Sequence, residues 1–294
     1  MKTYLDCIPC FLRQSLNAAR MVSPDPAVHE RIIREVLGWA DEIDMNRPPP
    51  AMGQRFHRRL REITGVRDPY HRAKEEQNRM ALALLPELRR ELASAHDPLL
   101  LAIHLAIAGN VIDMGVNGSV DESDMMRAVR QALDEPIVGD FERFRRAIAA
   151  AKTILYLADN AGEIAFDRLL IEQLPQGRVT VAVRGAPILN DATEIDARAV
   201  GIHEIAELIN NGSDAPGTIF NDCSEEFNRR FSEADLIIAK GQGNFETLSE
   251  EPGNIFFLFK AKCSVIADHA GVPLGAHVLV GPSAANSAPS ERMS

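Results

Sequence analysis

Apolar residues recur every three or four positions through most of the first 150 residues, which is the period of a helix with one buried face. Residues 96–115 are apolar nearly all round, which indicates a buried helix. Between residues 26 and 45 one stripe carries Val28, Ile32, Ile33, Val36 and Leu37. We therefore predict an all-helical domain over residues 1–150.

Residues 67–95 form the longest of these helical stretches. Pro86 lies inside it and is predicted to kink or split the helix, because proline lacks the N–H that the helix needs. Lys74 and Asn78 are four residues apart and share one helix face, which we predict to be solvated.

The pattern changes at residue 152, where short apolar runs alternate with helical stretches. The runs do not alternate between apolar and polar residues, which is typical of buried parallel strands. Clear strands are predicted within residues 153–160, 178–185, 234–241 and 254–263, with candidate strands within 201–212 and 276–281. The repeated βαβ order predicts an α/β fold with a doubly wound, mostly parallel sheet over residues 151–282. The small, polar residues 283–294 are predicted to be a flexible tail.

Composition narrows the function classes. The 294 residues are 46% hydrophobic, which is enough for a real core, and the net charge is -10. An acidic chain with 5% aromatic residues is a poor candidate for nucleic-acid binding.

The apolar run of residues 99–112 is too short to cross a bilayer, which takes about 20 apolar residues. Asp6 and Arg13 interrupt any signal-peptide core, so we expect a cytoplasmic protein without membrane or nucleic-acid partners. The sequence does not indicate the oligomeric state.

Oxygen-bearing side chains follow the first two clear strands. Asp159, Asn160 and Glu163 come after the first strand, and Asp191 comes after the second. Ligands of open α/β sheets bind beyond the carboxyl ends of the strands, so these side chains are candidates for one site. Carboxylate and amide oxygens are the ligands that hard divalent cations prefer.

Lysines and glycines follow the other two clear strands. Lys240, Gly241, Gly243 and Asn244 come after the third strand, and Lys262 comes after the fourth. A lysine binds a phosphoryl group as a point charge, and glycines let backbone N–H groups approach a phosphate. A metal ion opposite such groups is the arrangement that phosphoryl transfer needs.

Each feature alone has a structural explanation. Residues 159–163 could form an Asx turn, Asp191 could cap the next helix, and Lys262 could be a solvated lysine. Their recurrence at four strand ends favours a functional site.

Four segments, "DNAGE", "RGAPILNDATEIDA", "AKGQGNFE" and "KAKC", together resemble the DUF89 family of metal-dependent damage-control phosphatases with an ARMT1-like domain. The helical segments 7–14, 68–78 and 106–115 resemble its prokaryotic branch. The resemblance implies a helical N-terminal region packed on a Rossmann-like α/β domain. It also implies hydrolysis of phosphate monoesters, such as sugar phosphates or phosphorylated cofactor precursors, with Mn²⁺, Ni²⁺, Co²⁺ or Mg²⁺.

The resemblance also assigns roles to residues. It implies that Asp159, Asn160 and Asp191 bind the metal ion and that Lys262 binds the phosphate. It implies a substrate-binding stretch of Lys240, Gly241, Gln242, Gly243 and Asn244. We assign catalytic roles to Asp159, Lys262 and Glu163, with Glu163 orienting water or contacting substrate. Attack by metal-polarised water and attack by an aspartate both stay open.

Two further groups are candidates. Asn110 and Asp113 either end a buried helix or reach into an interdomain cleft and contact substrate. Cys7 and Cys10 form a CxxC pair, and Cys263 follows Lys262; zinc usually takes four ligands, so we interpret these cysteines as reduced thiols.

Two other protein classes compete with a phosphatase. A Rossmann-like methyltransferase or nucleotide-binding module would need a glycine-rich G-x-G-x-x-G loop after the first strand, which this sequence lacks. A non-catalytic protein built around a cysteine-bound metal is supported by the CxxC pair alone.

Overall fold

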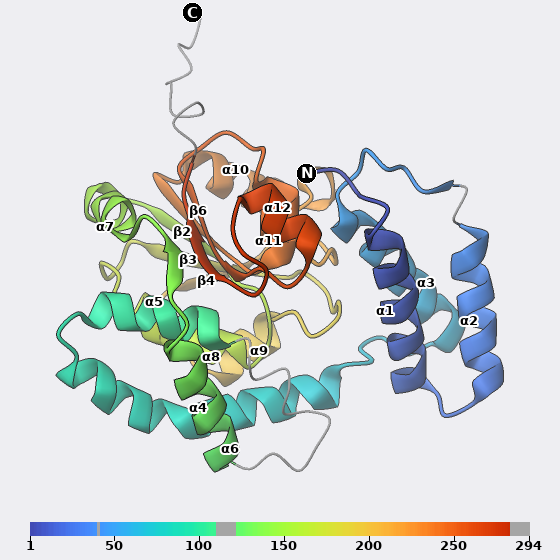
Figure 1. Ribbon diagram of the computed structural model, residues 1–294, viewed down its shortest axis with the longest axis horizontal. Coiled ribbons are helices and arrows are strands. Elements are labelled where there is room, and N and C mark those ends of the chain that lie inside the picture. The colour runs from blue at the N-terminus through green and yellow to red at the C-terminus, as the bar shows by residue number, and fades with distance from the viewer. Residues whose placement is uncertain (40–41, 110–121, 283–294) are drawn as a thin grey trace, which may run out of the picture.

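A seven-stranded sheet forms the centre of the protein, as a computed structural model shows (Figure 1). The structure describes residues 1–39, 42–109 and 122–282. The strands lie in the order β1-β7-β6-β5-β2-β3-β4. All neighbouring pairs are parallel except β6 and β7, which are antiparallel. The strand bounds are β1 Ile137–Gly139, β2 Ile154–Leu157, β3 Val179–Val183, β4 Glu207–Asn210, β5 Leu236–Lys240, β6 Ile255–Lys260 and β7 His277–Val280.

Helices precede the sheet and connect its strands. In the first 150 residues the helices are α1 Cys7–Val22, α2 Pro26–Gly38, α3 Pro49–Thr64, α4 His71–Ser94, α5 Pro98–Ala108, α6 Glu122–Leu133 and α7 Phe141–Ala150. Between the strands they are α8 Glu163–Ile171, α9 Glu194–Ala199, α10 Glu225–Glu233, α11 Gln242–Leu248 and α12 Ser264–Ala270. In the described part of the chain, no helix combines the length and the apolar character needed to span a membrane.

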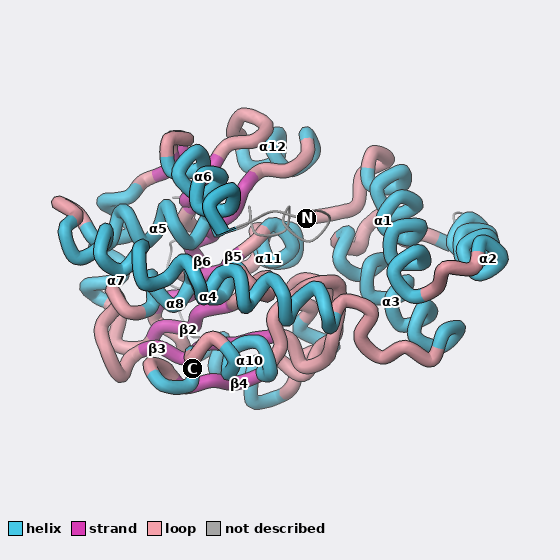
Figure 2. The backbone as a smooth tube through the Cα atoms, turned by 90° about the horizontal axis from the view of Figure 1, so that it is seen from below, coloured by secondary structure: helices cyan, strands magenta, loops and turns pink. Residues whose placement is uncertain are grey.

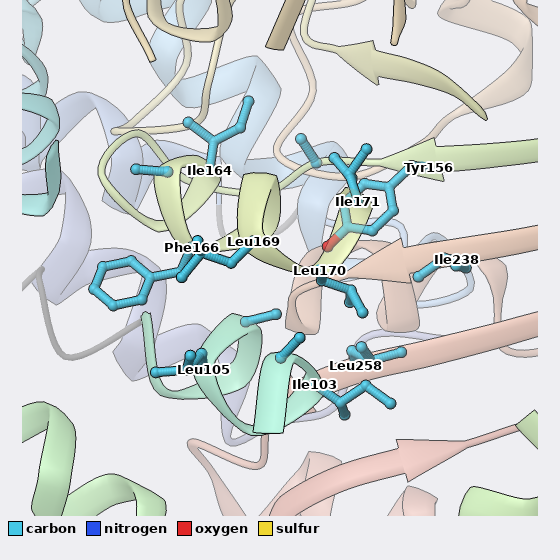
Figure 3. Close-up of a cluster of buried hydrophobic side chains, with 14 of the residues drawn as sticks. Ile103, Leu105, Tyr156, Ile164, Phe166, Leu169, Leu170, Ile171, Ile238 and Leu258 are labelled. Atoms are coloured by element: carbon cyan, nitrogen blue, oxygen red, sulfur yellow. The ribbon is translucent and has the colours of Figure 1, made fainter. Parts of the chain in front are cut away.

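Helices cover both faces of the sheet because its strands are apolar on both sides. Ile154 and Tyr156 of β2 join the core beneath α4 to α8, whereas Leu155 and Leu157 join the core beneath α10 to α12. Figure 3 shows part of the first core, where side chains of α5 and α8 meet those of β2, β5 and β6. The predicted doubly wound, mostly parallel sheet is confirmed, and both candidate strands are present as β4 and β7.

The direction of winding reverses between β2 and β5. Strands β2, β3 and β4 follow one another toward one edge, and β5, β6 and β7 follow one another toward the other. Leu157 at the end of β2 pairs with Ala239 near the end of β5. The loops that leave these two strands therefore start side by side, at the switch point where α/β proteins bind ligands.

The prediction that residues 1–150 are all helical is wrong at β1, which pairs with β7 in parallel. A strand of three residues is too short to leave a periodic pattern. The hydrophobic cores separate the chain between α3 and α4, and not at residue 150. Helices α1 to α3 share a small core of their own, whereas α4 to α7 share the core of the sheet (Figures 1 and 2). The predicted tail lies outside the described residues.

The prediction for Pro86 is wrong for a split, because α4 continues past it from His71 to Ser94, whereas a kink there stays a prediction. Pro86 is exposed, so its ring and the helix position that lacks an N–H face solvent. The long helix matters for the site because it carries two polar side chains beneath the loops that follow β2 and β3.

Candidate functional site at the switch point

Asp159 and Asn160 lie in the loop that leaves β2. The amide nitrogen of Asn160 donates hydrogen bonds to Asp159 Oδ2 at 2.8 Å and to Glu163 Oε2 at 3.1 Å. These bonds turn the nitrogen toward the carboxylates and leave the amide oxygen available for another partner. Asn160 and Glu163 are buried, and the side chain of Asp159 is 13% exposed, so the loop presents Asp159 to ligands.

The structure brings Asp191 to the same place. Asn160 and Asp191 form an antiparallel β-bridge, and the N–H of Ala192 donates to the carbonyl of Asp159 at 2.7 Å. Asp191 does not cap the next helix, because Thr193 is the N-cap and exchanges hydrogen bonds with Asp196. The three side chains predicted to bind a metal ion therefore lie together, at the ends of two neighbouring strands.

Arg184 lies between these carboxylates. Its Nε donates to Asp191 Oδ2 at 2.7 Å, its Nη1 donates to Asn244 Oδ1 at 3.3 Å, and its Nη2 lies 4.0 Å from Asp159 Oδ1. The side chain is only 3% exposed. Arg184 is the first residue of the segment "RGAPILNDATEIDA", and the sequence alone gave it no role, since arginines are mostly exposed to solvent.

Lys240 does not reach the substrate side of the site, which corrects its predicted role. Its side chain is fully buried. Its ammonium group donates to Glu163 Oε1 and Asp167 Oδ1 at 2.6 Å each, and to the carbonyl of Ala106 at 2.8 Å. An ammonium group has three N–H donors, so Lys240 has none left for a substrate.

Asn244 is also fully buried, so its predicted contact with substrate is wrong in this structure. Its Oδ1 accepts hydrogen bonds from Thr218 Oγ1 at 2.9 Å and from Arg184, and its Nδ2 donates to the carbonyl of Lys240 at 2.8 Å. Asn244 thereby fixes the guanidinium of Arg184.

Gly241, Gln242 and Gly243 shape the site in three different ways. A Cβ on Gly241 would overlap with the carboxylate of Asp159, and φ is +81° there, so the loop after β5 needs glycine. The side-chain oxygen of Gln242 accepts the backbone N–H of Lys262 at 3.1 Å. A Cβ on Gly243 would overlap with the carbonyl of Pro216. These three residues thus lie against three different neighbours, which are Asp159, Lys262 and Pro216.

Lys262 is exposed at the edge of this cluster. Its positive charge lowers the pKa of Asp159, of Glu163 and of Glu246, which places the ammonium group within electrostatic reach of all three carboxylates. Lys262 is thus an exposed cation of the site, on what we call its open side, whereas Arg184 and Lys240 are buried.

Glu163 lies beneath the site and holds Asn160, and it is not open to solvent. It is buried, and its two carboxylate oxygens are engaged by Lys240 and by Asn160. Burial raises its pKa, but the charge of Lys240 and the hydrogen bonds lower it further, so the net shift is downward and Glu163 stays ionised. Its predicted role in orienting water is therefore replaced by one in positioning Asn160.

Among the described residues, carboxylates outnumber the buried cations that pair with them around Asp159. The carboxylates of Asp159, Glu163, Asp167 and Asp191 form ion pairs with Lys240 and Arg184, and Lys74, which also acts on Asp191, pairs with Asp68 and Asp196. Burial and the charges of Glu163 and Asp191 raise the pKa of Asp159 well above its usual range. Burial likewise raises the pKa of Asp167 to about 6.

A divalent cation fits this donor set. It would stabilise the ionised form of Asp159, whose pKa is raised, and Asp159, Asn160 and Asp191 supply the oxygen ligands that hard cations prefer. Within the described residues, histidine, cysteine, aspartate and glutamate form no group of three or more arranged to hold a metal ion. The donor set after β2 and β3 differs from such a group because one of its three members is an asparagine.

Lys74 and Asn78 of α4 were predicted to be solvated, and this prediction is wrong. Asn78 is 5% exposed; its Oδ1 accepts the N–H of Gly162 at 2.7 Å, and its Nδ2 donates to Asp196 Oδ1 at 3.0 Å. Lys74 lies 3.1 Å from Asp196 Oδ2. One amide of α4 therefore joins the loop after β2 to the helix that follows Asp191.

Two other groups of candidates have different outcomes. Asn110 and Asp113 lie outside the described residues. Cys7, Cys10 and Cys263 form no disulfide in the described part of the chain and are partly exposed, and Cys263 Sγ lies 3.9 Å from Gln242 Nε2. Burial raises the pKa of Cys7 most, and the charges of Glu246 and Cys263 raise it further, so Cys7 is within electrostatic reach of both residues.

The fold and the site together define an α/β protein with a carboxylate–amide cluster at the switch point of its sheet. Comparison with known proteins identifies the group within that class. The sequence profile of the damage-control phosphatase ARMT1-like domain matches residues 3–278. The chain belongs to this family, also called DUF89, as its resemblance predicted.

Three relatives illustrate the likeness. A damage-control phosphatase of Archaeoglobus fulgidus is 37% identical, over 92% of this chain and 95% of the relative. An uncharacterized protein of Methanocaldococcus jannaschii is 36% identical, over 94% of each chain. The crystal structure of a DUF89 family protein from Pyrococcus horikoshii superposes with a TM-score of 0.88 at 33% identity, covering 95% of this chain and 98% of the other.

Proposed function

We propose that the protein is a divalent-metal-dependent phosphomonoesterase acting on small phosphorylated metabolites, such as sugar phosphates or phosphorylated cofactor precursors. The observation that carries the proposal is the cluster of Asp159, Asn160 and Asp191, in which the carboxylate of Asp159 has a raised pKa and Lys262 is the exposed cation nearby. The names of its archaeal relatives support a phosphatase role.

The residues divide the work of such a reaction. Asp159, Asn160 and Asp191 would hold the metal ion, which when bound supplies Lewis acidity toward a phosphoryl oxygen and lowers the pKa of a bound water. Lys262 binds the phosphoryl group from the open side, where an ammonium group acts as a point charge. Lys240 and Glu163 keep Asn160 in place beneath it.

The competing classes fit this site less well. A methyltransferase or nucleotide-binding module places a glycine-rich loop and a helix N-terminus against its ligand at the switch point. Here the same position carries Asp159 beside Asn160 and Asp191, whose negative charge would repel a nucleotide phosphate unless a cation lay between them.

The test is hydrolysis of p-nitrophenyl phosphate with and without Mn²⁺, Co²⁺, Ni²⁺ or Mg²⁺. We expect metal-dependent turnover in the wild type and none in Asp191→Ala, with Asp268→Ala, which removes an exposed carboxylate of α12, as a matched control at the wild-type rate. Full metal-dependent turnover by Asp191→Ala would overturn the proposal. A panel of phosphorylated metabolites then identifies the substrate.

A further inference from the structure

Arg184 has a donor that the protein does not use. Its Nη2 is buried and has no hydrogen-bond partner, and it lies 4.0 Å from Asp159 Oδ1. Leaving a buried N–H group without a partner is unfavourable, so such groups are rare unless something else binds them. This one lies in the middle of the candidate site.

The position of this donor is fixed by its neighbours. Nη1 of Arg184 bonds to Asn244, which is itself held by Thr218 and by the carbonyl of Lys240. The guanidinium is planar and rigid, so fixing Nε and Nη1 also fixes the direction of Nη2. The donor is therefore oriented before any ligand arrives.

The hydrogen bond to Asp191 does not explain why Nη2 of Arg184 is buried without a partner. An arginine that only holds a carboxylate commonly does so with two parallel N–H···O bonds. Arg184 bonds to Asp191 through Nε alone. The second terminal nitrogen, Nη2, lies instead 4.0 Å from Asp159 Oδ1, beside the carboxylates of the proposed ligand set.

We propose that Nη2 of Arg184 donates a hydrogen bond to a phosphoryl oxygen of the substrate, and to inorganic phosphate after hydrolysis. This inference rests on the proposed phosphatase function. Arg184 would then bind the phosphoryl group from below while Lys262 binds it from the open side. Charged, preoriented donors of this kind stabilise a phosphoryl group strongly because they need no reorganisation when it reacts.

The test is calorimetric titration of inorganic phosphate into the Mg²⁺-saturated enzyme, with Mn²⁺ affinity measured separately on the metal-free protein. Variants are Arg184→Met, which removes the charge, and Arg184→Lys, which keeps the charge without the fork. Arg168→Met is the matched control, because Arg168 is also partly buried and paired but bonds to Glu172 and Glu204.

We expect phosphate affinity to fall at least tenfold in Arg184→Met and by a smaller factor in Arg184→Lys. Mn²⁺ affinity should stay unchanged or improve, because a cation beside Asp191 has been removed. The control should bind both ligands like the wild type. If Arg184→Met does not fold, Arg184→Lys alone decides.

Two results would overturn the inference alone: wild-type phosphate affinity in the Arg184 variants, or weaker Mn²⁺ binding with normal phosphate binding at saturating metal. The second result is what a residue that merely holds Asp191 would give. A wild type that neither hydrolyses phosphate esters nor binds phosphate would overturn this inference and the proposed function together.

Discussion

A single glycine lets the loops after β2 and β5 approach each other. At Gly241 a Cβ would overlap with the carboxylate of Asp159. We predict that Gly241→Ala lowers both Mn²⁺ affinity and turnover by about 100-fold or more, because a displacement of about 1 Å at a catalytic group costs that much. The measurements are calorimetry of Mn²⁺ binding and steady-state hydrolysis of p-nitrophenyl phosphate.

Gly177 is the control for backbone strain at Gly241. Its φ is +74°, close to the +81° of Gly241, but nothing lies within 4 Å of an added Cβ. Gly177→Ala should therefore lose about 1–3 kcal/mol of stability from strain and keep normal metal binding. Equal effects of the two substitutions on metal binding would show that Asp159 does not depend on Gly241.

Lys240 is expected to act on stability before it acts on substrate binding. In Lys240→Met the carboxylates of Glu163 and Asp167 lose their shared cation in a buried place. Leaving a buried charge unpaired costs about 3–5 kcal/mol, which urea unfolding of the metal-free protein would detect. A variant of normal stability with a raised KM would instead restore the role of substrate ligand that the sequence suggested.

Helix α4 controls the spacing of the two loops that carry the proposed metal ligands. Asn78→Leu removes the bonds to Gly162 and to Asp196. We predict a loss of about 1–3 kcal/mol in stability from the unpartnered groups and about a tenfold loss in Mn²⁺ affinity.

The control for Asn78 comes from the same helix. Leu92→Ala opens a cavity in the core at the far end of α4, about 20 Å from Asn78 along the helix. It should lose about 2–5 kcal/mol of stability but no metal affinity. If both variants lost metal affinity in proportion to their stability, Asn78 would have no specific effect on the loops.

Helix α3 carries a buried histidine that should make stability depend on pH. Burial, with a smaller effect from Arg61, lowers the pKa of His57 to about 3, whereas an unfolded histidine titrates near 6.5. Between these values the unfolded chain binds more protons than the folded one, so the free energy of unfolding falls as pH falls.

His57→Leu should remove this dependence. The slope of the unfolding free energy between pH 4 and 6 should be smaller than in the wild type by about 1.4 kcal/mol per pH unit at most. Urea unfolding over this pH range measures it. An unchanged slope would show that His57 is accessible to protons in the folded protein.

Helices and strands could be predicted from the sequence where the pattern of apolar residues is long enough to show a period or an unbroken run. The buried strands β2, β3, β5 and β6 are unbroken apolar runs, and their order predicts the doubly wound sheet. Strand β1 was missed because three residues form no period. The solvated face predicted for Asn78 was wrong because its burial depends on residues 84 positions further along the chain.

Across the molecule as a whole, the sequence predicted where polar groups gather but not which of them face outward. Asp159, Asn160 and Asp191 lie together as expected, because parallel strands end at one edge. Lys240 and Asn244 follow a strand in the same way, yet both are fully buried. No sequence pattern distinguishes a lysine that binds substrate from one that neutralises Glu163 beneath the site.

The proposed function depends on one divalent ion that binds between the loops after β2 and β3. Anomalous diffraction from crystals soaked in Mn²⁺ would locate that ion without relying on activity. We predict one strong peak about 2.0–2.3 Å from oxygens of Asp159, Asn160 and Asp191. A site left empty by Mn²⁺, with the ion bound at Cys7, Cys10 and Cys263 or nowhere in the protein, would refute the proposal.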